Sequence, residues 1–217
     1  MLFSLTFLRV ELIRQLRNPY TFAFTLGMPV AMYMLFGANS EYADESAGHG
    51  NIAFYVMASM AAFGAAVAMT TASAFAASEV GQGWGRQIAM TPLSTAGYAA
   101  VKLAMGMTVA AFATLTVFVV GALTGARADD LWRWFAVAGI ILLGGLMFGL
   151  FGLGVGLAVN SDSASSLASM AVTFFGFFGN AFMPLEGVML DVAKFTPMYG
   201  YVSLVRWPIT DGALVSG

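Results

Sequence analysis

The stretch WFAVAGIILLGGLMFGLFGLGVGLAV, residues 134–159, contains no charged side chain and no proline. As an α-helix it would be about 39 Å long at 1.5 Å per residue, which is enough to cross the roughly 30 Å hydrocarbon core of a bilayer. Its apolar residues are continuous and do not alternate with polar ones, so a strand of a membrane β-barrel is disfavoured. The stretch therefore predicts a transmembrane helix.

Four more stretches of the chain are long, apolar and almost free of charge. They cover residues 19–36, 52–77, 98–123 and 165–184. Over the whole chain 59% of the residues are hydrophobic and 9% are charged, against about 25% charged residues in a soluble domain. The sequence thus predicts an all-α, polytopic integral membrane protein with five visible spans, the longest of which are expected to tilt.

Glycines recur at helical spacing inside residues 134–159. Gly145 and Gly149 form one G-x-x-x-G pair, and Gly152 and Gly156 form another. Such pairs let helix backbones approach closely in a membrane, where lipid removes the hydrophobic force between helices. The pattern predicts close packing within one subunit or, as the alternative, a contact between two subunits.

The basic residues at the start of the chain indicate its orientation. Arg9, Arg14 and Arg17 precede the first span, whereas residues 37–51 after it hold three acids and no base. By the positive-inside rule the N-terminus is predicted to be cytoplasmic. Residues 1–17 have leucines at helical spacing and no cleavable signal pattern, so they are expected to form an amphipathic interfacial helix that stays in the protein.

Composition and motifs exclude several classes of function. The net charge is −2 and no run of basic residues is present, which disfavours a nucleic-acid partner. Cysteine is absent, and the single histidine, His49, is expected in a solvated loop rather than at a metal. Because the H-E-x-x-H, G-x-S-x-G and Walker A patterns are missing, the chain is predicted to be no enzyme, with no catalytic residue, metal or cofactor of its own.

Polar and aromatic residues inside the spans are candidates for a substrate path. Most serines and threonines in membrane helices bond to a backbone carbonyl, so each hydroxyl is more often structural. Asn180 is more costly to bury, and the phenylalanines before it form either an interfacial aromatic belt or the lining of an apolar exit path. The candidate path residues are Thr70, Thr114, Phe174, Phe178 and Asn180.

The stretch EVGQGWGRQIAMTPLS, residues 79–94, interrupts the apolar pattern with glycines and charges. On the predicted topology it is cytoplasmic and long enough to form a docking element. Thr91-Pro92 is typical of an N-cap followed by proline at the first helical position, from which the third span would restart. The alternative is a solvated connector. The residues expected to be presented to a partner or to shape the segment are Glu79, Trp84, Arg86, Gln87, Thr91 and Pro92.

The segment 186–217 is too short and too charged to span the membrane. Val188, Met189, Val192 and Phe195 can share one face of a short helix that ends at Thr196-Pro197. The sequence predicts an extracytoplasmic segment here, either amphipathic or partly re-entrant.

Three stretches together resemble the membrane subunits of the ABC-2 type transporter family. They are EVGQGWGRQIAMTPLSTAGYAAVK at residues 79–102, LRNPYTFAFTLGMPVAMYMLFG at 16–37, and GNAFMPLEGVMLDVAKFTPMYGYVSLVRWPI at 179–209. The resemblance extends over most of residues 9–210. Their combination is far more specific than any one of the motifs.

The resemblance implies a connecting helix at 1–17, a transmembrane domain at 18–185 with a cytoplasmic coupling helix at 79–92, and external re-entrant helices at 186–217. The coupling helix would sit in a groove of a separate ATPase subunit, which binds ATP and magnesium, with Glu79 and Arg86 making polar contacts. Two permease subunits would form an export path for a drug, an antibiotic or a lipid across the bacterial plasma membrane.

In one respect the chain departs from the family pattern. Members usually have six spans, so a sixth span is expected after residue 217 and is missing from this sequence. The alternative functions are a secondary transporter or a membrane scaffold without transport activity. The absence of paired carboxylates within the spans disfavours proton-coupled transport.

Overall fold

The computed structural model describes residues 8–10, 12–13, 19–79, 83, 90, 94–159, 163–182, 185 and 187–212. Within these ranges the protein is helical, with two isolated β-bridges and no strand. The predicted all-α class is therefore confirmed. Residues 8–10 and 12–13 are helical, and the rest of the predicted interfacial helix lies outside the described residues.

In addition to residues 8–10 and 12–13, eight helical elements follow one another along the described part of the chain. They are α2 (Pro19–Tyr33), the π-helical turn η1 (Met34–Ala38), α3 (Ile52–Glu79), α5 (Thr95–Leu123), α6 (Leu131–Val159), α7 (Ala164–Phe178), α8 (Gly187–Ala193) and α9 (Pro197–Thr210). Helices α3, α5 and α6 are long and apolar enough to cross a membrane. The predicted multi-pass membrane protein is confirmed by these three helices.

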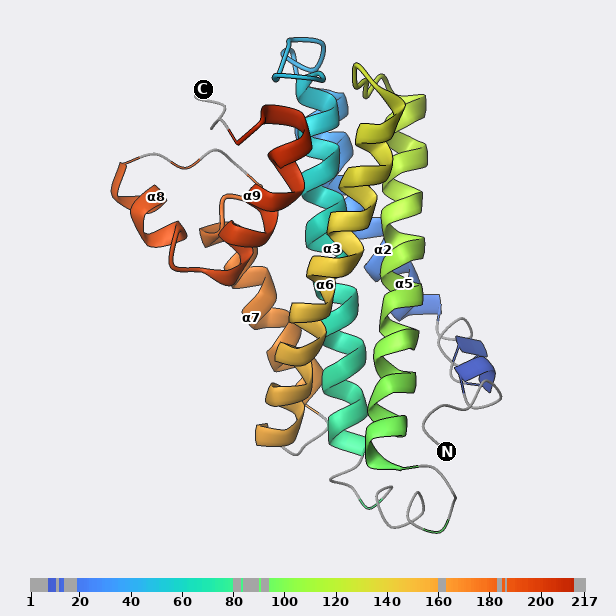
Figure 1. Ribbon diagram of the computed structural model, residues 1–217. Coiled ribbons are helices and arrows are strands. Elements are labelled where there is room, and N and C mark those ends of the chain that lie inside the picture. Colours follow the sequence, from blue (N-terminus) through green and yellow to red (C-terminus); the bar gives the residue numbers. More distant parts are fainter. Residues whose placement is uncertain are drawn as a thin grey trace.

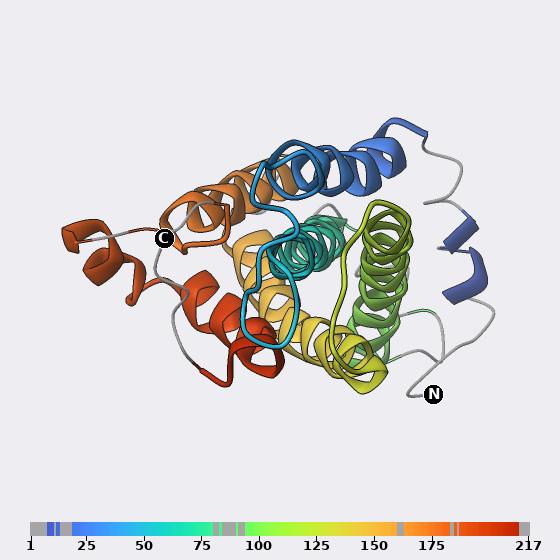
Figure 2. The same ribbon diagram turned by 90° about the horizontal axis from the view of Figure 1, so that it is seen from above.

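Helix α3 is the central element of the fold. It packs against α2, α5, α6, α7 and α9, which surround it when the molecule is viewed from above (Figure 2). In its most apolar window 78% of the residues are buried within the chain, against 39% for α5 and 33% for α6. Alanine supplies much of this buried surface, and small side chains let the neighbouring helices approach closely.

Helices α3 and α6 approach closely along the predicted glycine face, which consists of Gly145, Gly149, Gly152 and Gly156. All four glycines are buried. A Cβ atom on Gly152 would lie 2.2 Å from the backbone oxygen of Thr70, and one on Gly156 would lie 2.4 Å from that of Ala74. The prediction of packing within one subunit is therefore confirmed.

The fifth predicted span is shorter than the sequence indicated. Residues 165–184 were expected to form one helix, but α7 ends at Phe178 and contains 15 residues. At 1.5 Å per residue it is about 22 Å long, less than the thickness of the hydrocarbon core. The helix ends because Asn180 adopts the left-handed region, with φ 58°. In Figure 1, α7 covers only the lower half of the bundle.

After α7, the short helices α8 and α9 form a hairpin beside the bundle (Figure 1). Thr196 caps α9, since its hydroxyl accepts a hydrogen bond from the backbone N–H of Tyr199 at 3.3 Å. Helix α9 packs against α3, α6 and α7. The Tyr201 hydroxyl donates to the backbone oxygen of Ile141 at 2.7 Å, and Arg133 donates to that of Pro208.

At one end of the bundle, side chains hold the loop 39–51 to the loop 124–130. The side-chain oxygen of Asn51 accepts hydrogen bonds from the backbone N–H groups of Phe54, at 3.0 Å, and Arg127, at 2.9 Å. Its amide donates to the backbone oxygen of Gly125 at 2.8 Å. Asn51 thus caps α3 and fixes the position of the second loop.

His49 is expected in a solvated loop, and it is partly exposed there, but it also joins three segments of the chain. Its Nδ1 lies 3.3 Å from the carboxylate of Asp129, and its Nε2 lies 2.8 Å from that of Asp211. The backbone N–H of His49 donates to Ile209 at 2.8 Å. The end of α9 is therefore attached to both loops.

Candidate functional site at the junction of α3 and α5

A buried ion pair joins the end of α3 to the start of α5. The Nζ atom of Lys102 lies 2.7 Å from Oε2 of Glu79, the last residue of α3. The Tyr98 hydroxyl donates to the same carboxylate oxygen at 2.8 Å and lies 3.2 Å from the backbone oxygen of Ala76. Tyr98 and Lys102 are four residues apart, so both project from one face of α5.

Because the pair is buried, the energetic cost of each charge is offset in part by the other charge. The Lys102 side chain is 0% exposed and that of Glu79 is 11% exposed. Removing a charge from water costs several kcal/mol, and a close opposite charge with further hydrogen bonds is what offsets this cost. Loss of either partner would remove the opposite charge that lies 2.7 Å from the other side chain inside the protein.

The start of α5 has a different cap from the one predicted. The third span was expected to restart at Thr91-Pro92, but α5 begins at Thr95, with Ser94 as its N-cap. The Ser94 hydroxyl accepts from the backbone N–H of Gly97 at 3.1 Å. Serine at this position satisfies one of the free N–H groups of the first helical turn, which is why the helix begins here.

Most of the predicted ATPase-coupling residues lie outside the described residues: Trp84, Arg86, Gln87, Thr91 and Pro92. Glu79 is described, and its carboxylate faces Lys102 and Tyr98 in the interior of the chain. Between Glu79 and Ser94 only Gly83 and Met90 are also described, and both are exposed. The geometry thus holds both ends of the segment 79–94, at Glu79 and at Ser94.

The five candidate path residues do not converge on one site. The Thr70 hydroxyl donates to the backbone oxygen of Phe148 at 3.1 Å and joins α3 to α6. Thr114 is buried on α5, and its hydroxyl has no hydrogen-bond partner within the described part of the chain. Asn180 uses its side-chain oxygen to accept from the N–H of Leu185 at 3.0 Å, in the turn after α7. Phe174 and Phe178 stack at 5.0 Å.

Two apolar cavities flank α7. One, of about 400 Å³, lies between α2, α3 and α7, and the other, of about 440 Å³, lies between α7 and α8. Phe174 and Phe177 line both cavities and are more than half exposed. The predicted aromatic cluster therefore lies at cavity walls, where it can contact apolar molecules.

Sequence reasoning missed the role of Lys102. A lysine within an apolar stretch of a helix is itself a signal, because a charge there requires a partner. The partner could not be read from the sequence, since Glu79 lies 23 positions earlier and the pairing depends on how α3 and α5 pack.

Comparison with known proteins agrees with this architecture. The sequence model of the ABC-2 type transporter family matches residues 4–210. The chain is 28% identical over 209 residues to "Putative transport permease YvfS" of Bacillus subtilis (strain 168), in an alignment that covers 93% of this chain and 83% of that protein. No solved structure matches the chain. Because the family match covers nearly all of its residues, the chain belongs to the ABC-2 type transporter family and is a membrane subunit of a transporter.

Proposed function

We propose that this subunit works with a separate ATPase in an exporter, and that residues 79–92 are the coupling segment through which the ATPase moves the membrane helices. The observation that carries this proposal is the buried Glu79–Lys102 ion pair at the base of the segment. ATP and magnesium would bind to the ATPase, because the sequence has no Walker A pattern of its own.

The ion pair supports coupling because it joins the helix before the segment 79–92, α3, to the helix after it, α5. Glu79 ends α3, while Tyr98 and Lys102 lie in the first turns of α5. A displacement of the segment would therefore move α3 and α5 together. Helix α6 would follow α3, because their backbones touch at Gly152 and Gly156.

The proposed substrate is a hydrophobic or amphipathic molecule, such as a drug, an antibiotic or a lipid, which moves along the face of α7. The cavity between α7 and α8 is lined by apolar side chains, and the one between α2, α3 and α7 is lined by apolar side chains together with the hydroxyls of Thr25, Ser166, Ser169 and Thr173. On the same helix Leu167, Met170, Phe174 and Phe177 are exposed at helical spacing. We propose that a second permease subunit packs against these exposed residues of α7. The complex would lie in a bacterial plasma membrane, with the N-terminus of this chain in the cytoplasm.

Coupling is tested by co-purification of this chain from membranes with a candidate ATPase subunit, preferably one encoded beside it. Arg86→Ala should reduce the amount of bound ATPase, because it removes a charge from the coupling segment. The matched control is Arg127→Ala, which removes an exposed arginine from the loop at the opposite end of the bundle. Equal recovery of the ATPase with both variants would contradict the proposal. Transport that persists without the ATPase and follows a pH gradient would favour a secondary transporter.

The subunit contact is tested with single cysteines, which the natural sequence lacks. Phe177→Cys on α7 should form an intermolecular disulfide under mild oxidation. Leu143→Cys on α6 is the control, since Leu143 is also exposed and apolar. Cross-linking at position 143 and not at position 177 would place the second subunit on the other side of the bundle.

A further inference from the structure

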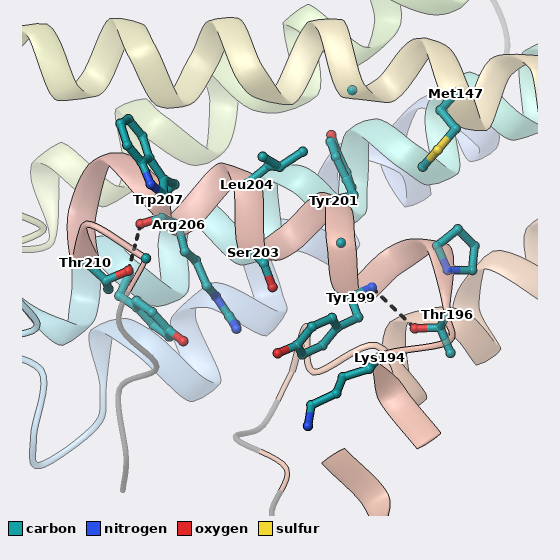
Figure 3. A pocket seen from close by; sticks show the side chains of 15 residues that line it. Met147, Lys194, Thr196, Tyr199, Tyr201, Ser203, Leu204, Arg206, Trp207 and Thr210 are labelled. Carbon is teal, nitrogen blue, oxygen red and sulfur yellow. Dashed lines mark hydrogen bonds between the residues drawn. The ribbon is translucent and has the colours of Figure 1, made fainter. Parts of the chain in front are cut away.

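A third cavity lies along the outer side of α9, reaches α6 at Met147, and has a volume of about 860 Å³. Most of its lining comes from α9, with Met147 from α6 and Lys194 from the turn before α9 (Figure 3). The polar ends of Arg206, Tyr199 and Lys194 point into the same part of this cavity (Figure 3). It shares no lining residue with the two cavities beside α7.

Arg206 is a buried cation at the wall of this cavity, with 8% of its surface exposed. Its Nε donates to the Ser59 hydroxyl at 2.8 Å, and its Nη2 lies 3.4 Å from the backbone oxygen of Ala181. The guanidinium carbon is 4.2 Å from the centre of the Tyr55 ring. These contacts hold the side chain in place, but each partner is neutral.

Arg206 differs from the other buried cations in lacking a counter-charge. Lys102 pairs with Glu79 at 2.7 Å, and Arg133 pairs with Asp130 at 3.4 Å. Among the described residues, no carboxylate lies within 4.0 Å of the Arg206 guanidinium. Arginine does not lose its proton in proteins, so its charge cannot be relieved by titration. An unpaired charge within a membrane protein is costly, and such residues mark binding sites.

The chemistry around Arg206 indicates the anion. Lys194 is already paired with Asp191, at 2.9 Å, so the described charges of the cavity leave a single uncompensated positive charge. A phosphodiester carries one negative charge and has oxygens that match the guanidinium fork. The cavity also reaches Leu204 and Met147, whose exposed apolar side chains can pack against hydrocarbon. They lie on the α6 side of α9, across this helix from the polar ends of Arg206, Tyr199 and Lys194 (Figure 3).

We propose that this cavity binds an anionic phospholipid, with its phosphodiester against Arg206 and an acyl chain along Leu204 and Met147. The Tyr199 and Ser203 hydroxyls, which line the cavity, are available as further donors to the phosphate. The site is independent of the transport path proposed beside α7. On the proposed orientation it would take its lipid from the outer leaflet.

The test is lipid binding by native mass spectrometry of the full chain, purified in detergent and titrated with phosphatidylglycerol or with zwitterionic phosphatidylcholine. Phosphatidylglycerol should bind more tightly, because only its net charge compensates Arg206. Arg206→Gln should weaken phosphatidylglycerol binding by about tenfold or more, the factor expected when a charge-assisted hydrogen bond is lost.

A second variant leaves Arg206 and its contacts unchanged. Gly200 lines the cavity, and a Cβ on it would meet no atom within 4 Å, so Gly200→Leu should fill the space without displacing neighbours. Gly139→Leu on α6 is the matched control, since a Cβ there also meets nothing and Gly139 does not line the cavity. Gly200→Leu should lose the preference for phosphatidylglycerol, and Gly139→Leu should keep it.

Three results would overturn the assignment. The first is equal binding of the two lipids by the natural chain. The second is an equal preference in Gly200→Leu and Gly139→Leu. The third is displacement of phosphatidylglycerol by glycerol phosphate at equal concentration, which would show a site for a free phosphate anion rather than for a lipid.

Discussion

Gly152→Ala should push α3 and α6 apart, because the two backbones touch at this position. The added Cβ would lie 2.2 Å from the Thr70 oxygen, whereas real Cβ atoms essentially never come within 3.0 Å of another heavy atom. The helices must therefore separate by about 0.8 Å at this point. The atom that blocks the Cβ belongs to the backbone of α3, so no change of side-chain rotamer relieves the clash.

The expected loss of stability follows from three contributions. Insertion of one carbon into a well-packed contact costs about 1–3 kcal/mol. The hydrogen bond from Thr70 to the Phe148 oxygen, one turn away on α6, spans the same contact and is worth about 0.6–1.7 kcal/mol in a membrane protein. Alanine favours the helix over glycine by up to about 1 kcal/mol, which offsets part of this loss. The net destabilisation is roughly 1–4 kcal/mol, which corresponds to roughly 3–12 °C in the unfolding temperature.

Thermal unfolding of the purified chain in detergent measures this loss, and Gly154→Ala is the matched control. Gly154 lies on the same helix, and a Cβ there meets no atom within 4 Å. Gly154→Ala should therefore unfold at or slightly above the temperature of the natural chain. If both variants unfold at the same temperature, close backbone packing of α3 on α6 is not what these glycines provide.

Three further predictions concern side chains that hold the helices together, each measured by thermal unfolding in detergent. Asn51→Ala should destabilise by at least about 2 kcal/mol because it leaves buried backbone groups unpaired, whereas Asn51→Asp, which keeps the acceptor oxygen, should lose less; equal losses would contradict the capping role. Lys102→Met should cost about 3–5 kcal/mol because it removes the cation 2.7 Å from the buried Glu79 carboxylate, and adding Glu79→Gln to it should restore part of the stability; simple additivity of the two losses would argue against a coupled pair. Tyr201→Phe should cost about 1 kcal/mol, because it removes the hydrogen bond to Ile141, and an unchanged unfolding temperature would show that this bond adds nothing.

The spans could be predicted from the sequence because their lengths are set by the bilayer. The stretches 52–77 and 134–159 lie within α3 and α6, and each helix extends the predicted range by only a few residues. The glycine face of α6 was also predicted, since its spacing is a property of one helix. Local periodicity and hydrophobicity were sufficient for these features.

The end of α7 and the place of Glu79 could not be predicted in the same way. Residues 179–184 continue the apolar composition of α7, and the break depends on the left-handed conformation of Asn180. Glu79 was expected to face a partner because it belongs to the segment 79–94, which is predicted to be a cytoplasmic docking element. Its actual neighbour, Lys102, lies on another helix, and that contact depends on the packing of α3 against α5.

The positions of these contacts along α3 suggest how the proposed coupling would act. Glu79 joins the lower end of α3 to α5, Gly152 and Gly156 contact the lower half of α3 at Thr70 and Ala74, and Asn51 attaches its upper end to the loop 124–130 that connects α5 to α6. Helices α3, α5 and α6 are thus joined at three levels and should move as one body. Helix α7 has apolar cavities on two sides, so its packing is looser. A movement that begins at the coupling segment would therefore change the distance between this body and α7, which is where the proposed substrate path lies.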